Sequence, residues 1–151
     1  MNDPMQEDQE RPLRLARVGS LSIAIPEEAI QTIVEWREPT PLPFAPDTIL
    51  GVVCLEGRML TVLDTAKLLD VDLSSRKFIA VLRGKEQLAL AIDDTDVAGH
   101  VPAGEVQTPP ESARHLIKGT IMRGQERVHL LNLNELFGAA IQGYERRRRR
   151  F

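Results

Sequence analysis

The segment Ile49-Leu-Gly-Val-Val-Cys-Leu-Glu-Gly-Arg-Met-Leu-Thr-Val-Leu-Asp64 contains two short apolar runs separated by a polar turn. The runs are Ile49–Leu55 and Met59–Leu63, and Glu56-Gly57-Arg58 joins them. Apolar runs of this length around a glycine-containing turn are typical of a β-hairpin. Asp64 follows directly and is a residue type that caps helices, so the segment predicts a hairpin followed by a short helix bearing Leu68 and Leu69.

Three further hairpins are expected along the chain, each around a glycine. They comprise Leu13, Leu15, Leu21, Ile23 and Ile25 around Gly19-Ser20, Phe78–Leu82 and Leu88–Ile92 around Gly84, and Ile117–Met122 and Arg127–Leu131 around Gly124. Two proline-bearing segments, 37–46 and 102–110, exclude regular structure. The stretch Asp93–Val101 is ambiguous.

Two more short helices are expected between these hairpins. Pro26 followed by Glu27 and Glu28 suits a helix start, and Ile30, Ile33 and Val34 would give that helix an apolar face. The sequence Asn132-Leu-Asn-Glu135 resembles a capping box that opens a final helix.

The order of the elements repeats. Gly51–Leu69 aligns without gaps on Gly119–Phe137, which places the capping residue Asp64 on Asn132. Each half then carries about five short strands, and small closed barrels are the arrangement that removes exposed sheet edges. We therefore expect two small barrels, with an apolar seam between them that serves as a binding groove.

The composition is that of a soluble domain with an aliphatic core. Of the 151 residues 42% are hydrophobic, 4% aromatic and 27% charged, and the net charge is −3, which gives no bias toward nucleic acid or membrane. The single cysteine, Cys54, cannot form an internal disulfide. The acidic first ten residues do not predict a signal peptide, and no apolar run approaches the roughly 20 residues that span a bilayer. A cytoplasmic protein is expected.

The hairpin segment Ile49–Asp64 resembles the signature of CheW-like domains, which runs approximately GV-x-N-L-R-G-x-x-x-P-V-[IV]-D-L. Ile23–Ile33 is similar to the opening strand and helix of that family, and Ala91-Ile-Asp93 occupies the place of a usual Val-Asp pair. Leu116–Leu133 is similar to the closing segment. The resemblance covers residues 13 to about 138.

The resemblance implies a mainly β fold of two intertwined SH3-like five-stranded barrels with short helices. It implies a single domain at 12–140, with barrels at approximately 12–70 and 77–138 that exchange strands, between a disordered leader at 1–11 and an arginine-rich tail at 141–151. The implied function is that of a non-enzymatic adaptor in chemotaxis-like signal transduction. Its partners would be a methyl-accepting chemoreceptor tip and the regulatory domain of a CheA-type histidine kinase, with no cofactor, no small-molecule substrate and membrane contact only through the receptor.

The resemblance also indicates which residues bind partners, and three of them depart from the family pattern. Cys54 replaces the usual Asn, Glu56 replaces the usual Arg, and Thr32 stands where the family often has an acid. The expected partner-binding residues are Thr32, Cys54, Leu55, Glu56, Gly57 and Arg58. Reversal of charge at Glu56 would repel an acidic patch that an arginine attracts, so we hypothesise an altered partner.

Several residues have a structural interpretation that competes with a functional one. Cys54 lies in an apolar strand, which favours a packing role over nucleophilic or redox chemistry. Asp64 and Asn132 are interpreted as caps, and the wide spacing of the three histidines argues against a metal site. Trp36 is left open between a core role and a partner anchor. No acid–base or nucleophilic constellation converges, so an enzyme is not expected.

Two alternative functions remain. One is a CheW-like scaffold that docks a pole-localising or type IV pilus factor instead of a receptor. The other is a small barrel that binds nucleic acid through the run Arg146 to Arg150, although scarce aromatics and the acidic net charge argue against it.

Overall fold

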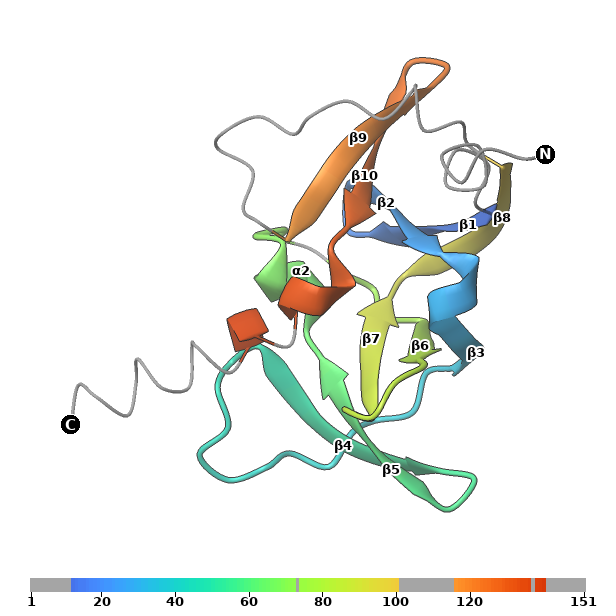
Figure 1. Cartoon of the computed structure of the whole chain (residues 1–151). Helices are drawn as coiled ribbons and strands as arrows, with labels where there is room; N and C mark the ends of the chain where they lie inside the picture. Colours follow the sequence, from blue (N-terminus) through green and yellow to red (C-terminus); the bar gives the residue numbers. More distant parts are fainter. Residues whose placement is uncertain (1–11, 73, 101–115, 137, 141–151) are drawn as a thin grey trace.

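The computed structural model describes residues 12–72, 74–100, 116–136 and 138–140, and these form ten strands with short helical connections (Figure 1). The elements in chain order are β1 (Pro12–Val18), β2 (Leu21–Pro26), η2 (Glu27–Ala29), β3 (Ile30–Glu35), β4 (Ile49–Leu55), β5 (Arg58–Leu63), α2 (Thr65–Leu68), β6 (Phe78–Leu82), β7 (Leu88–Ile92), β8 (Asp94–His100), β9 (Ile117–Arg123) and β10 (Glu126–Leu131). Residues 133–136 and 138–140 are helical. The expected leader at 1–11, the second proline-bearing segment at 102–110 and the tail at 141–151 lie outside the described residues.

The strands form two five-stranded sheets, and each sheet takes strands from both halves of the chain. The orders are β8-β1-β2-β10-β9 and β3-β6-β7-β5-β4. Within each sheet the halves meet through two strand pairs, a parallel pair (β2 with β10, or β5 with β7) and an antiparallel pair (β1 with β8, or β3 with β6). Replacing every strand by its counterpart in the other half converts one order into the other. The prediction of a mainly β fold of two intertwined five-stranded barrels is therefore confirmed, and it follows the repeat in the sequence.

The repeat extends to the ends of the second hairpin in each half. The backbone N–H of Asp64 donates to the carbonyl of Thr48 over 2.7 Å, and the N–H of Asn132 donates to the carbonyl of Leu116 over the same distance. The Asp64 carboxylate also accepts a hydrogen bond from the N–H of Lys67 at 3.2 Å. The predicted cap at Asp64 is thus confirmed, and a helical turn follows each of the two aligned residues.

The prediction of a helix after Pro26 is wrong. Only Glu27–Ala29 form a 3₁₀ turn, and Ile30, Ile33 and Val34 belong to β3, which pairs with β6. Because this segment is rich in β-branched residues, it fits a strand once a partner strand is present. The ambiguous stretch after Asp93 is resolved in the same way, since residues 94–100 pair with β1.

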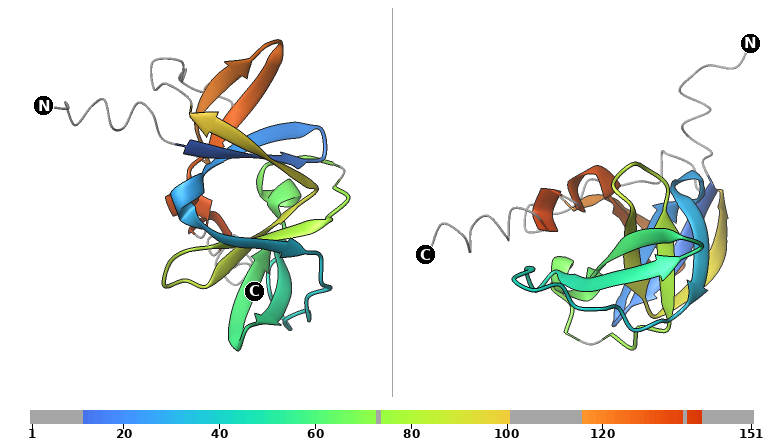
Figure 2. Two further views of the ribbon diagram at one scale, coloured as in Figure 1. Left: turned by 90° about the vertical axis from the view of Figure 1, so that its right-hand side faces the viewer. Right: turned by 90° about the horizontal axis from the view of Figure 1, so that it is seen from below.

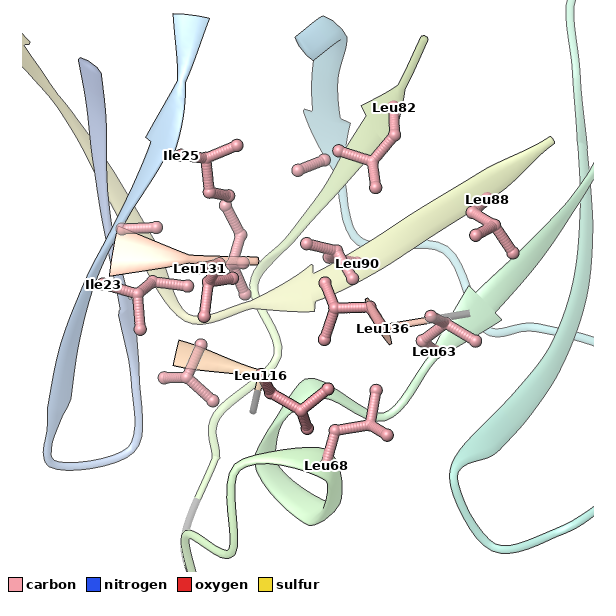
Figure 3. Packing of buried hydrophobic residues seen from close by; sticks show 14 of the residues in the cluster. Ile23, Ile25, Leu63, Leu68, Leu82, Leu88, Leu90, Leu116, Leu131 and Leu136 are labelled. Carbon is pink, nitrogen blue, oxygen red and sulfur yellow. The ribbon is translucent and has the colours of Figure 1, made fainter. Parts of the chain in front are cut away.

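The largest buried cluster lies between the two sheets (Figure 3). It combines Ile23 and Ile25 of β2, Leu88 and Leu90 of β7, and Leu136 with further residues from both halves and both helical turns. The seam that the sequence suggested as an open binding groove is therefore filled by aliphatic side chains, because the larger residues of the central strands point there. A pocket lined by Leu21, Leu69, Val71 and Asp93, among others, remains at the edge of this seam, and its use as a binding groove stays a prediction.

Side-chain size decides what each face of the central strands packs against. In β7 the residues Leu88, Leu90 and Ile92 face the cluster between the sheets, whereas Ala89 and Ala91 face the interior of their own barrel. In β2 the small residue Ala24 likewise faces its barrel interior. A five-stranded barrel has room for only small side chains from its central strand, so this alternation of large and small residues matches a small barrel packed on a second one.

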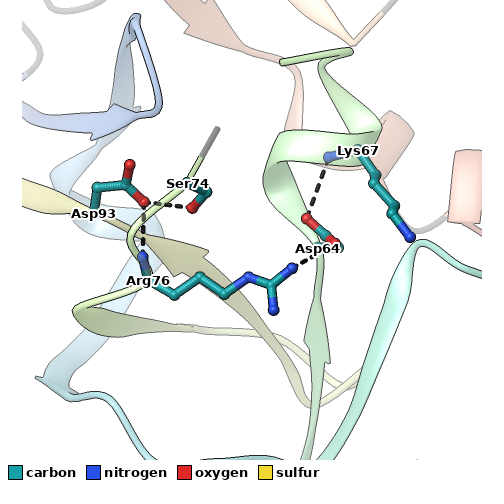
Figure 4. Close-up of polar contacts among 5 residues, drawn as sticks. All are labelled: Asp64, Lys67, Ser74, Arg76 and Asp93. Carbon is teal, nitrogen blue, oxygen red and sulfur yellow. Dashed lines mark hydrogen bonds and ion pairs between the residues drawn. The ribbon is translucent and has the colours of Figure 1, made fainter. Parts of the chain in front are cut away.

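A buried carboxylate ties the β1–β2 turn to the segment between the halves, and its contacts with that segment are drawn in Figure 4. Asp93, at the end of β7, accepts hydrogen bonds from the N–H of Gly19 at 2.7 Å, from the N–H of Arg76 at 3.0 Å and from the Ser74 hydroxyl. The guanidinium of Arg76 continues to the buried Asp64 carboxylate, 3.0 Å away. One short segment therefore links both halves through two acidic side chains.

This network makes the stability of the fold depend on pH. Burial alone would raise the pKa of the Asp93 carboxyl, but the hydrogen bonds from Ser74 and from the backbone N–H groups outweigh it and hold the pKa below its ordinary value. A carboxyl with a lowered folded-state pKa contributes stability above its unfolded pKa of about 3.9, and this stability is lost as the pH falls through the folded-state pKa.

We expect Asp93→Asn to lower the free energy of unfolding by roughly 1–3 kcal/mol at pH 7, because buried donors lose a charged acceptor. The difference from wild type should persist down to about pH 4 and shrink at lower pH, as measured by urea unfolding at several pH values. The exposed neighbour Asp94→Asn is the control and should change stability little. A wild-type minus Asp93→Asn difference that grows on acidification would contradict this account.

Gly51 of β4 allows the first proline-bearing segment to lie against the sheet. Thr40 and Val52 exchange two backbone hydrogen bonds of 2.9 Å, and Pro39 is buried beside them. At Gly51 φ is +149°, and a Cβ placed there would lie 2.3 Å from the Thr40 carbonyl oxygen. Only glycine permits this approach, which explains the glycine in the hairpin segment.

We expect Gly51→Ala to lower the free energy of unfolding by roughly 2–3 kcal/mol, since the added carbon displaces Thr40 and strains φ. Gly124→Ala is the matched control, because φ is +63° there but no atom lies within 4 Å of the added carbon. Its cost should be about 1 kcal/mol from φ alone. Equal losses for the two variants in thermal unfolding would show that contact with Thr40 is unimportant.

Candidate functional site

The β4–β5 hairpin carries five of the six expected partner-binding residues and projects from one end of the molecule (Figures 1 and 2). Leu55 and Arg58 are the last paired residues, and Glu56 and Gly57 form the turn between them. Both turn residues have positive φ, +50° and +77°, which is the pattern of a type I′ turn. This turn accounts for Gly57 and places the Glu56 side chain at the exposed tip.

Strand pairing separates the hairpin residues onto two faces. Cys54 stands opposite Met59, and both are exposed, with Met59 64% accessible. We call this side, formed by Val52, Cys54, Met59 and Thr61, the outer face. Leu55 and Arg58 point to the inner side, where half-buried Leu55 packs against the barrel core. The packing role inferred for Cys54 is therefore wrong, because register rather than strand hydrophobicity decided which face it takes.

A β-bulge in β3 brings a second segment to the inner side of the hairpin. Ile30 pairs with Leu82 and Thr32 with Val81, so Gln31 is the extra residue. The bulge leaves both Gln31 and Thr32 exposed, and the guanidinium of Arg58 donates a 2.7 Å hydrogen bond to the Gln31 side-chain oxygen. Bulges commonly re-aim a side chain in this manner. The predicted residues Thr32 and Arg58, 26 positions apart in the sequence, thus belong to neighbouring surface.

Trp36, which the sequence left open, packs against the core of the same barrel. It is half-buried, and its indole N–H donates to the Glu38 carboxylate at 3.2 Å. A ring that packs against the core on one side and is hydrogen-bonded at its polar edge has a defined position in the fold. The structure therefore favours the core role for this residue.

The counterpart hairpin, β9–β10, projects from the opposite end and differs in chemistry (Figure 2). Met122 stands opposite Arg127 and Thr120 opposite His129, at the positions equivalent to the outer face. Burial, with a smaller contribution from the nearby Arg127 charge, lowers the pKa of His129. The outer face of β4–β5 has no charged residue, whereas the equivalent surface of β9–β10 has an arginine and a histidine. The two ends of the molecule are therefore chemically distinct.

The described residues show no arrangement suited to metal binding or to crossing a membrane. No group of three or more histidine, cysteine, aspartate or glutamate residues is placed to hold a metal ion in this part of the chain. Its helical segments are all too short or too polar to span a bilayer. The side chains of His100 and His115 are not among those that the structure describes. What the hairpin offers is a contact surface, uncharged on one side and polar on the other.

Sequence reasoning missed two residues of this surface. Met59 stands directly opposite Cys54, and two-residue turn spacing around Glu56-Gly57 would have revealed that pair. Gln31 contacts Arg58 only because of the bulge, for which the sequence carries no clear signal. The expected residues Thr32, Cys54, Leu55, Glu56, Gly57 and Arg58 all lie on the hairpin or beside it, and their partner-binding role stays a prediction.

Comparison with known proteins gives concordant matches. The model of the CheW-like domain family matches residues 13–140. Protein FrzA of Myxococcus xanthus is 29% identical over 136 residues, covering 83% of this chain and 84% of the relative. Chemotaxis protein CheW of Rhizobium meliloti (strain 1021) is 27% identical over 135 residues, covering 84% and 87%. The scaffolding protein TtCheW of Thermoanaerobacter tengcongensis has a similar fold, with a TM-score of 0.77 at 16% identity, covering 85% of this chain and 92% of that structure.

We expect the Cys54 thiol to react with a maleimide in the folded protein nearly as completely as in urea, because the side chain is exposed on the outer face. Mass spectrometry of the labelled protein measures the extent, and Cys54→Ser is the control for other reactive groups. Labelling should leave the unfolding temperature nearly unchanged. Protection of the thiol in buffer, with reaction only after unfolding, would mean that the register of this hairpin is different.

Proposed function

The chain belongs to the CheW-like domain family, and from this premise we propose that it is a scaffold that couples a chemoreceptor to a CheA-type histidine kinase in chemotaxis-like signalling. The observation that carries the proposal is the β4–β5 hairpin, which presents two chemically different faces at one end of a rigid double barrel. Two faces on one short hairpin allow two partners to be held in a fixed geometry.

The outer face suits the kinase. Cys54 and Met59 are exposed opposite each other, and the outer face to which they belong has no charged residue. Exposed apolar surface on a small domain indicates a protein contact, and the centres of such contacts are depleted in charge. The regulatory domain of the kinase is itself CheW-like, so a contact between the ends of two barrels would pair similar apolar surfaces. The outer face therefore suits a partner that binds through apolar contacts.

The inner side and the tip suit the receptor. Thr32, Gln31 and Arg58 are polar and lie together, and Glu56 extends from the turn. Hydrogen-bonding and charged groups at the rim of a contact select partners and orient them, more than they add affinity. Glu56 replaces the arginine that is usual in the family signature, so the receptor tip selected here would carry basic or neutral residues at the facing position. The change affects which receptor binds while the fold is kept.

Control of phosphorylation would then come from the position in which the scaffold holds the kinase relative to the receptor. The scaffold holds the kinase against the receptor, and movement of the receptor is transmitted through a body whose two sheets each take strands from both halves of the chain. No cofactor, metal or reacting group of this chain takes part in that mechanism. The changes at Cys54 and Glu56 also favour a second candidate, a scaffold that docks a pole-localising or type IV pilus factor in place of the receptor.

We expect purified protein to retain both a CheA-type kinase and a chemoreceptor from native cell extract. Met59→Glu should reduce retention of the kinase at least tenfold, because it places a charge at the centre of an apolar contact. Glu56→Arg should alter retention of the receptor and leave kinase retention unchanged. Quantitative mass spectrometry of the retained proteins measures both.

Met122→Glu is the matched control, since it introduces the same charge on the exposed part of the other hairpin. It should leave kinase retention near the wild-type level. Equal loss with Met59→Glu and Met122→Glu would refute the assignment of the kinase to the outer face. Retention of a polar or pilus factor without a receptor would replace the coupling role by the second candidate.

A further inference from the structure

Arg58, on the inner side of the β4–β5 hairpin, has no acidic partner among the described residues. In the same part of the chain Arg14, Arg17 and Arg76 each form an ion pair with a carboxylate. The guanidinium of Arg58 is instead held by the neutral side chain of Gln31, to whose oxygen Nη1 donates a hydrogen bond of 2.7 Å. A half-buried cation that is fixed in place but not paired keeps its charge available to another molecule.

The hydrogen bond to Gln31 leaves the most directional edge of the guanidinium open. Nη1 makes that bond, and no described residue accepts a hydrogen bond from Nε or Nη2 of Arg58. In Arg14 these same two groups, Nε and Nη2, bind the two carboxylate oxygens of Glu27. An arginine presents Nε–H and Nη2–H as a planar fork that matches a carboxylate. Arg58 therefore offers to solvent the edge with which Arg14 binds an acid.

The residues beside this guanidinium add neutral donors and no further cation. Because the side-chain oxygen of Gln31 faces Arg58, its amide N–H groups are directed elsewhere, and Thr32 is exposed next to it in the bulge. Arg58 is the only lysine or arginine in the described strands β3, β4 and β5. Nucleic acid and anionic membranes are bound by clustered cations. A lone fixed arginine with neutral donors suits a single carboxylate of a protein.

We propose that Arg58 is a specificity-determining residue of the receptor contact, and that it binds one carboxylate of the receptor tip through Nε–H and Nη2–H. This inference rests on the proposed function, in which the inner side of the hairpin faces the receptor. It adds the chemistry of that partner, which has an aspartate or glutamate opposite Arg58 and a basic or neutral residue opposite Glu56. Because a bidentate pair is directional, it fixes the register of the receptor as well as its identity.

The test measures receptor retention from native cell extract for two variants, with kinase retention as the internal control. Arg58→Gln removes the charge, and receptor retention should fall roughly tenfold or more while kinase retention stays at the wild-type level. Gln31→Glu keeps Arg58 but gives it an acid within the chain, at a position already in hydrogen-bond distance. It should lower receptor retention in the same way and leave the unfolding temperature unchanged or higher.

Gln125→Glu is the matched control for added charge, since it makes the same change in the exposed turn of the β9–β10 hairpin. It should retain the receptor as wild type does. If Arg58→Gln and Gln31→Glu lost kinase and receptor together, the two residues would be maintaining the hairpin, and the role in specificity would be overturned.

A cross-link with no spacer identifies the group that Arg58 contacts. In Arg58→Lys, a carbodiimide should join the introduced amine to an aspartate or glutamate of the receptor tip, and mass spectrometry locates the bond. Met59→Lys, on the outer face, is the control and should give no link to the receptor. Links from both positions, or from neither while the receptor is retained, would overturn the carboxylate contact.

The outcomes separate this contact from the proposed function. Wild-type receptor retention by both Arg58→Gln and Gln31→Glu would overturn the carboxylate contact and leave the coupling role in place. Failure of the wild-type protein to retain a receptor would overturn the coupling role and the carboxylate contact with it.

Discussion

Two parallel strand pairs, β2 with β10 and β5 with β7, are the constraint on which the rest of the structure depends. Each pair joins strands from different halves, so neither half can complete a sheet by itself. The aliphatic cluster between the sheets draws on both halves in the same way. Such contacts join distant parts of the sequence, so each half depends on the other for its sheets and for its core. A scaffold that transmits position benefits from this property.

Aliphatic side chains fill the space between the barrels, and the hairpin faces that we propose for partners lie at the ends of the molecule. The central strands direct their large side chains inward to each other, and the β4–β5 and β9–β10 hairpins project at opposite ends (Figure 1). The buried acids Asp93 and Asp64, joined through Arg76, hold the connection between halves against this core. Rigid support beneath an exposed hairpin keeps its two faces at a fixed angle. The side chains exposed on the hairpin can therefore differ in chemistry without a change in the packing of the core.

The repeat also explains how one fold obtains two different ends. Equivalent positions carry Cys54 and Met59 on one hairpin and Met122 and Arg127 on the other. Exposed positions in paired strands tolerate such changes because they do not enter the cores. One end thereby gains an uncharged outer face. The difference between the ends allows a symmetric framework to bind partners at one end without offering the same surface at the other.

The sequence by itself determined the hairpins, the cap at Asp64, the repeat and the family, because turns, capping residues and apolar runs act over a few neighbouring residues. It also placed five of the six expected partner-binding residues on one hairpin, while it assigned the sixth, Thr32, to a helix. Only the tertiary structure decided that residues 30–35 form a strand, that Cys54 faces solvent, that Gln31 bulges toward Arg58 and that the seam is filled. Each of these depends on the register of a partner strand far away in sequence, and a shift of one residue exchanges the two faces.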